Sequence, residues 1–451
     1  MNREEQLTIL EEREKENRLA DIVIAGIPIW DIIKHPLREK YLVNTGHLER
    51  IHNKRANMNP SSLWYVFVSF IHFLKLVSGM YKSSNLLVGF SRFEKVGNLY
   101  VDKYVDPLVK LTNLKDDYLY LEYGTHGLHF QNRTIDRRFY TDYINIISRF
   151  VGCIWGVILY NKYKREILSF CKKASFCLGF EVKTKWVARK IATFSCLTSL
   201  YSLLLKRCNI KRVFGVSRII FNHVAFAAKK LDVPVYELQH GITVEKTPLY
   251  MGQYNPDIDP DLFLLFGEGC PRNVFGVPEE NTLQIGWAFF DFLKEDKQDI
   301  DDSRCLLISS ADISDKIISV GRELAEKHHD IQFDIRRHPM EIYNSDQKSI
   351  LEKTANLNDV SSSECSAAAI MKYKYIIGEG SSVLYEALCM GKKVARLACI
   401  GVELRNRSED DAFYYLDDLS QFDDFLKAPH KELKKRAYTK FDKDLFNSLL
   451  K

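Results

Sequence analysis

The sequence predicts an α/β protein of two domains, each a doubly wound parallel sheet, facing each other across a cleft. The chain has 451 residues, above the size at which a single hydrophobic core usually stops growing. In both halves, short apolar strands alternate with amphipathic helices, a pattern typical of βαβ units with right-handed crossovers. A polar, acidic segment at 294–303 separates the two series, and we interpret it as the linker.

The first domain, residues 1–293, is expected to contain extra long helices. A charged helical lead at 1–18 is expected to add little to the core. Between 136 and 208, apolar side chains recur at helical spacing without proline, which predicts a helical insertion. Another helix is expected at 218–231. The predicted strands lie at 20–27, 85–90, 118–123, 212–216, 234–238, 261–266 and 282–285.

The alternation starts again after the linker and predicts a second Rossmann-type domain over residues 300–430. Its clearest helix is expected at 314–327. Residues 431–451 are expected to form a helix that packs back on the first domain. The predicted strands of the second domain lie at 305–308, 332–335, 375–378 and 393–397.

Charge and cysteine content exclude several classes of protein. The formal net charge is +5 and the pI about 8.5, too mild to predict nucleic-acid binding. The ten cysteines form no C-x-x-C pair and have no metal-ligand spacing. We therefore expect reduced thiols, a cytoplasmic protein, and neither a metal nor another cofactor.

Two apolar segments and a basic region bear on membrane contact. Residues 63–77 are interrupted by polar side chains and predict a buried helix, with an interfacial helix as the alternative. Residues 150–160 are too short to cross a bilayer. Lys and Arg crowd 133–190, which predicts either a solvated helix face or attraction to anionic lipid. Any membrane attachment is therefore expected to be peripheral, at the inner face of the cytoplasmic membrane.

A glycine-flanked Ser-Ser turn between a strand and a helix is the most informative motif. The N–H groups that open a helix lack intrahelical partners and carry the positive end of its dipole, so they bind phosphate. Gly380 allows close approach of an anion, and Ser381 and Ser382 add hydroxyl donors. Glu386 lies about one turn further, where a carboxylate can accept both hydroxyls of a ribose. The alternatives are a plain helix cap and a solvent-exposed glutamate.

A second motif ends the strand predicted at 332–335. Arg336, His338 and Pro339 follow it, at the sheet edge where α/β folds bind ligands. His338 is expected to donate to a phosphate oxygen, and Pro339 fixes the direction of the backbone. A satisfied surface histidine is the alternative. We expect this strand end and the Ser-Ser turn to converge on one nucleotide-sugar site.

Two loops of the first domain offer a general base. Glu122 and His126 lie in the glycine-rich loop that begins at the end of strand 118–123, with His129 close behind. His240 lies in a Gln-His-Gly turn after strand 234–238, and its pKa near neutrality suits proton transfer. Glu122, His126 and His240 are therefore the candidate catalytic residues. For His240, a turn histidine bonded to backbone is the alternative.

Together these motifs resemble bacterial surface-polysaccharide glycosyltransferases of the GT-B type. The resemblance covers mainly residues 210–400 and rests on the His-Pro strand end, the Ser-Ser turn before Glu-Ala-Leu, and the Gln-His-Gly turn. Similar arrangements occur in transferases of CMP-activated sugars, such as sialic acid and Kdo. The resemblance implies that His338, Ser381 and Ser382 hold the CMP phosphate. The paired acidic motif that supplies the base in sialyltransferases is not found, which leaves the base and the sugar open.

The expected function is transfer of a sugar from a nucleotide-activated donor, CMP-linked by the resemblance. The acceptor would be a growing capsule or lipopolysaccharide chain or another lipid-linked glycan. Three alternatives stay open: a CDP-glycerol or CDP-ribitol phosphotransferase, a nucleotide-sugar epimerase, and a non-catalytic factor for polysaccharide assembly. The predicted donor-binding residues are Arg336, His338, Pro339, Gly380, Ser381, Ser382 and Glu386.

Overall fold

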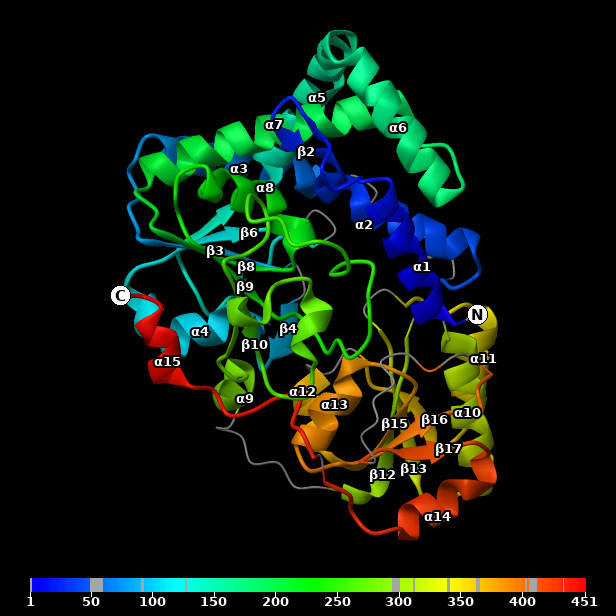
Figure 1. The fold of residues 1–451 in the computed structure, drawn as a ribbon. Helices are drawn as coiled ribbons and strands as arrows, with labels where there is room; N and C mark the ends of the chain where they lie inside the picture. Colours follow the sequence, from blue (N-terminus) through cyan, green and yellow to red (C-terminus); the bar gives the residue numbers. More distant parts are fainter. Residues whose placement is uncertain are drawn as a thin grey trace.

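The computed structural model describes most of the chain (Figure 1). The described residues are 2–48, 60–90, 93–125, 128–293, 301–310, 313–338, 341–361, 366–401, 404, 412–432 and 434–451. Two parallel sheets, each flanked by helices, dominate the structure. The predicted residues His126 and Pro339, and most of the predicted linker, lie outside the described residues.

The first sheet has seven strands, all parallel, in the spatial order β11-β10-β9-β8-β3-β6-β7. Side chains alternate between its faces. Leu86 and Val88 pack toward the side of α3, α7 and α8, whereas Leu87 packs toward α4, α9 and α15 (Figure 1). The strands are β3 (Asn85–Val88), β6 (Leu119–Glu122), β7 (Arg138–Tyr140), β8 (Arg212–Val216), β9 (Val235–Leu238), β10 (Leu262–Leu265) and β11 (Thr282–Gln284).

The second sheet has six parallel strands in the order β14-β13-β12-β15-β16-β17. Leu307 and its neighbours pack on α10 and α14, and Leu306 and Ile308 pack on α12 and α13. The strands are β12 (Asp301–Ile308), β13 (Gln332–Arg336), β14 (Leu357–Asp359), β15 (Tyr373–Gly378), β16 (Lys393–Leu397) and β17 (Tyr414–Leu416).

Both sheets have the same topology. Numbered within its own sheet, each series has the order 3-2-1-4-5-6, with one further strand in the first sheet. This is the doubly wound Rossmann order, and its direction reverses between strands 1 and 4. The switch points therefore lie between β3 and β8 and between β12 and β15. Two such domains in series confirm the predicted α/β, GT-B-like fold class.

The helices of the first domain are α1 (Arg3–Glu16), α2 (Ile29–Asn44), α3 (Pro60–Val77), α4 (Asp106–Leu111), α5 (Asp142–Lys162), α6 (Lys164–Leu178), α7 (Thr184–Arg207), α8 (Arg218–Lys229) and α9 (Ala288–Leu293). The long helices α5, α6 and α7 lie within residues 136–208, where helices are expected, and α5 and α6 extend beyond the sheet (Figure 1). Helix α5 has 21 residues, longer than the apolar run at 150–160 predicts. In the part of the chain that the structure describes, it is the one helix long and apolar enough to cross a membrane.

The remaining helices are α10 (Ser314–Lys327), α11 (Ser345–Lys353), α12 (Ser366–Met371), α13 (Ser382–Cys389), α14 (Phe422–Lys427) and α15 (Lys443–Ser448). The chain returns to the first domain at its end (Figure 1). There the Phe446 ring of α15 lies 5.6 Å from Phe214 of β8. One apolar cluster joins α4 and α9 of the first domain to α12 and α13 of the second, so the domains share a core.

Two expectations for the N-terminal region are wrong. The strand expected at 20–27 is instead a two-residue antiparallel pair, β1 (Val23–Ile24) with β2 (Ile27–Pro28), outside the large sheets. Positive φ angles at Ala25 and Gly26 turn the chain there. The lead at 1–18 does contribute to the core, because α1 buries Leu7 and Leu10 completely.

Candidate functional site

The carboxyl edge of the second sheet brings the two predicted motifs together. Strands β13 and β15 flank β12, and Arg336 and Gly378 each pair in register with Ile308. Since neighbouring strands are about 4.8 Å apart, the two strand ends lie about 10 Å apart. They point to the same edge of the sheet, on either side of β12 and next to the switch point where doubly wound sheets bind ligands.

The loop after β13 is held by a buried carboxylate. Glu341 accepts from the His338 backbone N–H at 3.0 Å and from the hydroxyls of Ser309 and Ser314. Ser309 follows β12, so these bonds fix the loops after β12 and β13 to each other. His338 is half-buried in this loop.

The two arginines of this loop have different surroundings. Arg337 is engaged by Asp359 at 2.9 Å and by Ser361, which draws it toward β14. Arg336 donates from Nε to Ser366 Oγ at 3.1 Å. Its Nη1 atom is buried and has no hydrogen-bond partner among the described residues. Arg336 therefore keeps donor capacity at the carboxyl edge of the sheet, one strand away from the switch point.

The Ser-Ser turn opens helix α13. Ser381 is the N-cap, and its Oγ accepts from the Val383 N–H at 3.3 Å; Ser382 is the first helical residue. The neighbouring strand β16 holds the turn in place, because its buried Arg396 donates from Nε to the Glu379 carbonyl at 2.7 Å. Gly380 is buried beside the turn. The structural role of Ser381 as a cap therefore exists, as the sequence alternative states.

Glu386 meets the first domain across the domain boundary. Its carboxylate lies 3.4 Å from Lys103 Nζ, and Lys103 is 3.8 Å from Glu94. Glu94 accepts from the Ser366 N–H at 3.4 Å, and Ser366 in turn accepts from Arg336. Burial raises the pKa of Glu386, and the Lys103 ammonium opposes that rise. These contacts join both domains around the predicted donor site.

Lys103 and Glu94 were not predicted as site residues. Glu94 belongs to an unpredicted hairpin, β4 (Phe93–Val96) with β5 (Leu99–Asp102), and Lys103 directly follows it. The signal was present in the sequence, because a Gly-Asn pair at 97–98 between two short alternating segments is typical of a tight hairpin.

His240 lies in its predicted turn after β9. Tyr250 Oη is 2.9 Å from its Nδ1, and Tyr104 Oη donates to its carbonyl at 2.6 Å. Tyr104 directly follows Lys103, which links this turn to the Glu386 contact. These two tyrosines hold the His240 ring and its backbone in place.

Glu122 occupies a different environment. It ends β6, is fully buried, and binds His129 Nδ1 at 2.8 Å, Arg133 at 2.5 Å and Arg138 at 3.3 Å. His129 Nε2 also lies 2.8 Å from Asp142. This network ties the loop at 128–138 to the sheet. No described group of three His, Cys, Asp or Glu side chains has the arrangement of a metal site.

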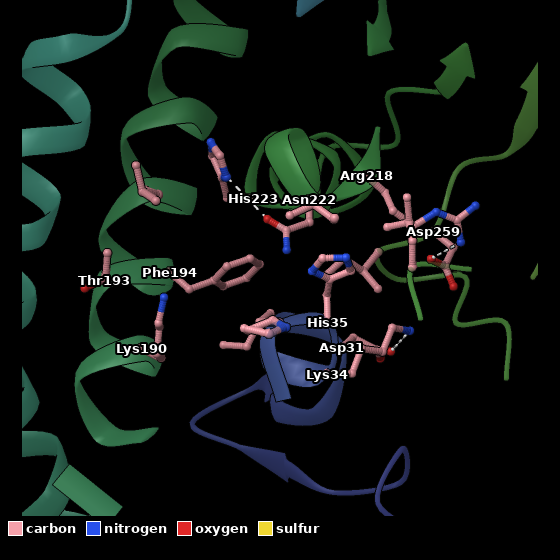
Figure 2. Close-up of a pocket in the computed structure, with 16 residues that line it drawn as sticks. Asp31, Lys34, His35, Lys190, Thr193, Phe194, Arg218, Asn222, His223 and Asp259 are labelled. Carbon is pink, nitrogen blue, oxygen red and sulfur yellow. Dashed lines mark hydrogen bonds and ion pairs between the residues drawn. The ribbon is translucent and has the colours of Figure 1, made fainter. Parts of the chain in front are cut away.

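A cavity of about 320 Å³ lies in the first domain, between α2, α7 and α8 (Figure 2). In Figure 2, His35 of α2 faces Asn222 of α8 across it, with Phe194 and Lys190 of α7 along one side. Most of its exposed lining surface is apolar, although nine of its sixteen lining residues are polar or charged. The cavity is therefore not at the predicted donor site but beside the first sheet.

The cavity is bordered by neutral imidazoles and a paired arginine. Burial lowers the pKa of His35 to about 4 and that of His223 to about 3, so both are uncharged at neutral pH. Arg218 binds Glu237 at 2.9 Å and Asp259 at 3.0 Å. Its guanidinium also lies 5.1 Å from the ring of Tyr250, the partner of His240. The side chains of Arg218 and Tyr250 therefore lie between the cavity and His240.

Comparisons with known proteins give a likeness of fold only. No family model and no curated protein matches the chain. A UDP-GlcNAc 2-epimerase from Methanocaldococcus jannaschii is 10% identical, with a TM-score of 0.48, over 81% of this chain and 99% of its own. One from Neisseria meningitidis is 13% identical, with a TM-score of 0.41, over 70% and 82%. TarM is 15% identical, with a TM-score of 0.33, over 51% of each chain. The fold assignment rests on the strand order, and these matches carry no conclusion about activity.

Proposed function

We propose that the protein is a glycosyltransferase that uses a nucleotide-activated sugar, with the donor at the carboxyl edge of the second sheet. The observation that carries the proposal is the buried Nη1 atom of Arg336, at the sheet edge next to the switch point, which has no hydrogen-bond partner among the described residues. A buried donor without an acceptor costs free energy. A phosphate oxygen accepts strongly from a guanidinium and would remove that cost.

In this proposal the donor phosphate is held from both strand ends. Arg336 and His338 would contact it from the β13 side, and Ser382 with the opening turn of α13 from the β15 side. Glu386, which now faces Lys103, would accept from the ribose hydroxyls, while Lys103 turns to the phosphate. Two cations and a helix N-terminus would stabilise the charge that develops on the leaving nucleotide.

The acceptor is proposed to bind the first domain. The cavity in Figure 2 supports this, because its surface is mostly apolar and its polar lining includes two neutral histidines, a mixture that suits a glycan linked to an apolar group. In an inverting reaction, His240 would take the proton of the acceptor hydroxyl as its oxygen attacks the anomeric carbon. The bond from that carbon to the nucleotide phosphate breaks, and the nucleotide leaves with the electron pair. Tyr250 would hold the His240 ring in position.

The first test is a thermal-shift screen of CMP, CDP, UDP, GDP and their sugars. The proposal expects one nucleotide family to raise the melting temperature, with CMP as the first candidate from the motif resemblance. Ser382→Ala and His338→Ala should each weaken that nucleotide in calorimetry. Binding that is equal in both variants and wild type would contradict the assignment of the site.

A turnover assay then separates the reaction classes. Transfer releases free nucleotide only when an acceptor is present. An epimerase would isomerise the donor alone, and a phosphotransferase would consume CDP-glycerol and release CMP. A protein that binds none of these ligands but still binds a membrane or a partner protein would be an assembly factor.

A further inference from the structure

Helix α5 turns its large apolar side chains outward. Phe150, Ile154 and Val157 on its outer side are 60, 56 and 62% exposed, and Ile146 and Ile158 are exposed beside them. A surface helix of a water-soluble domain normally turns such a face to the core. Only 28% of the apolar 18-residue stretch of α5 is buried. The outer side of this helix therefore fits an apolar medium better than water.

The inner side of α5 has the complementary character. Ser148, Gly152 and Gly156 are buried against α7. A Cβ atom on Gly152 would lie 2.0 Å from Thr193 Oγ1, and one on Gly156 would lie 3.0 Å from the Arg189 Cα. Small residues that let two helices approach closely are typical of helix contacts within lipid. The face of α5 toward α7 thus carries small residues, and its outer face carries large apolar ones.

Helix α3 adds to the same region. It packs beside α5, where the ring of Phe70 lies 4.9 Å from Tyr143. Leu63, Trp64 and Phe67 of α3 are all more than half exposed, as is Trp155 of α5. Tryptophan is enriched where a protein meets the membrane–water boundary. Two exposed tryptophans on adjacent helices fit that position.

Positive charge accompanies these apolar side chains. Between residues 143 and 210 the acidic residues are Glu166 and Glu181 only. Burial and the neighbouring Arg149 and Arg189 lower the pKa of Lys190, which shows that cations crowd the junction of α5 and α7. The basic residues of the same segment are Arg149, Lys162, Lys164, Arg165, Lys172, Lys173, Lys183, Lys185, Arg189, Lys190, Lys206 and Arg207.

We propose that the outer side of α5, with the exposed side chains of α3, inserts into the headgroup region of a bilayer that contains anionic lipid. The helix lies in the surface and does not cross it, because its inner side is packed on α7. Its projection from the body in Figure 1 leaves it free to reach a flat surface. Cations on α5, α6 and α7 attract the anionic headgroups. This inference does not depend on sugar transfer.

The test is co-sedimentation of the full chain with vesicles. One preparation contains phosphatidylcholine alone and the other an equimolar mixture of phosphatidylcholine and phosphatidylglycerol. The wild type should bind the anionic vesicles, and its tryptophan emission should shift to the blue as Trp64 and Trp155 leave water. The double variant Phe150→Ser/Ile154→Ser should bind at least about tenfold more weakly. Lys172→Glu should weaken binding about fivefold or more, because each cation near an anionic surface favours binding.

Ile342→Ser is the matched control, because Ile342 is 67% exposed but lies on the second domain. It should bind vesicles as the wild type does. Melting temperatures equal to that of the wild type would show that each variant is folded. Failure of the wild type to bind anionic vesicles, or equal binding by the double variant, would overturn the proposal. So would a wild-type dimer that the double variant dissociates, because a second copy would then cover α5.

Discussion

Buried charged groups at two strand ends of the molecule differ in whether they have hydrogen-bond partners. At the end of β6, Glu122 is buried and its oxygens bind His129, Arg133 and Arg138. At the end of β13, Arg336 leaves a buried nitrogen without a partner among the described residues. Both lie at the carboxyl edge of a doubly wound sheet, where ligands are expected. Position at that edge therefore does not separate a ligand-binding residue from a structural one; the partners of its polar atoms do.

Because the Glu122 carboxylate is fully paired, we expect its substitution to lower the unfolding free energy more than any other change considered. Glu122→Gln keeps the shape of the side chain but removes the charge that three basic groups share, so we expect a loss of about 3–5 kcal/mol in unfolding free energy. Urea unfolding would measure it, with Glu432→Gln, at an exposed glutamate, as the control. Normal stability with abolished transfer would instead support Glu122 as the general base.

The first domain should also make stability depend on pH. Burial between Tyr123 and Tyr201 lowers the pKa of His223 to about 3, against about 6.5 in the unfolded chain. Because the folded pKa is depressed, this stability is present above pH 6.5 and is lost as the pH falls below it. We expect a slope of about 1.4 kcal/mol per pH unit from His223 alone.

Two more histidines act in the same direction, and one opposes them. Burial lowers the pKa of His35 and of His72 to about 4. Burial also disfavours the charged form of His129, but Asp142 and Glu122 outweigh it and raise its pKa, so its contribution is lost as the pH rises. The difference in unfolding free energy between wild type and His223→Gln should shrink as the pH falls from 7 to 5. Parallel curves would show that His223 is accessible to protons in the folded state.

The smallest expected effects are on stability and nucleotide binding, and they differ between the two serines of the turn. Ser381→Ala removes the N-cap of α13 and should cost about 1 kcal/mol of stability. Ser382→Ala should leave stability unchanged but weaken nucleotide binding. Thermal melts with and without nucleotide would compare them. The reverse pattern would move the phosphate contact from Ser382 to Ser381.

The sequence predicts the regular elements well where one signal dominates. Strand β8, helix α10 and strand β16 have the predicted bounds, because continuous apolar runs and amphipathic spacing define them. The strand expected at 20–27 fails, because its apolar residues are divided by a turn at Ala25 and Gly26 and pack on helices instead. Local apolar pattern could not show which neighbours would cover it.

The sequence predicts the part of the candidate site that the second domain supplies, but not the part that the first domain supplies. The strand ends carrying Arg336 and Ser381 follow from βαβ topology, since all strands of a parallel sheet end at one edge. The partner of Glu386 does not, because Lys103 is 283 residues away and comes from another domain. The partners of Glu122 are hidden for the same reason, since charge pairing across loops leaves no periodic trace in the sequence.

The most direct test of the central claim is calorimetric titration of wild type, Arg336→Ala and Arg337→Ala with the nucleotide found in the screen. A buried charged hydrogen bond contributes about 1.5–3 kcal/mol, so Arg336→Ala should bind about 10- to 150-fold more weakly. Arg337→Ala, whose side chain is held by Asp359, should bind as the wild type does. Equal affinity of wild type and Arg336→Ala would contradict the account, because the donor phosphate would then lie elsewhere.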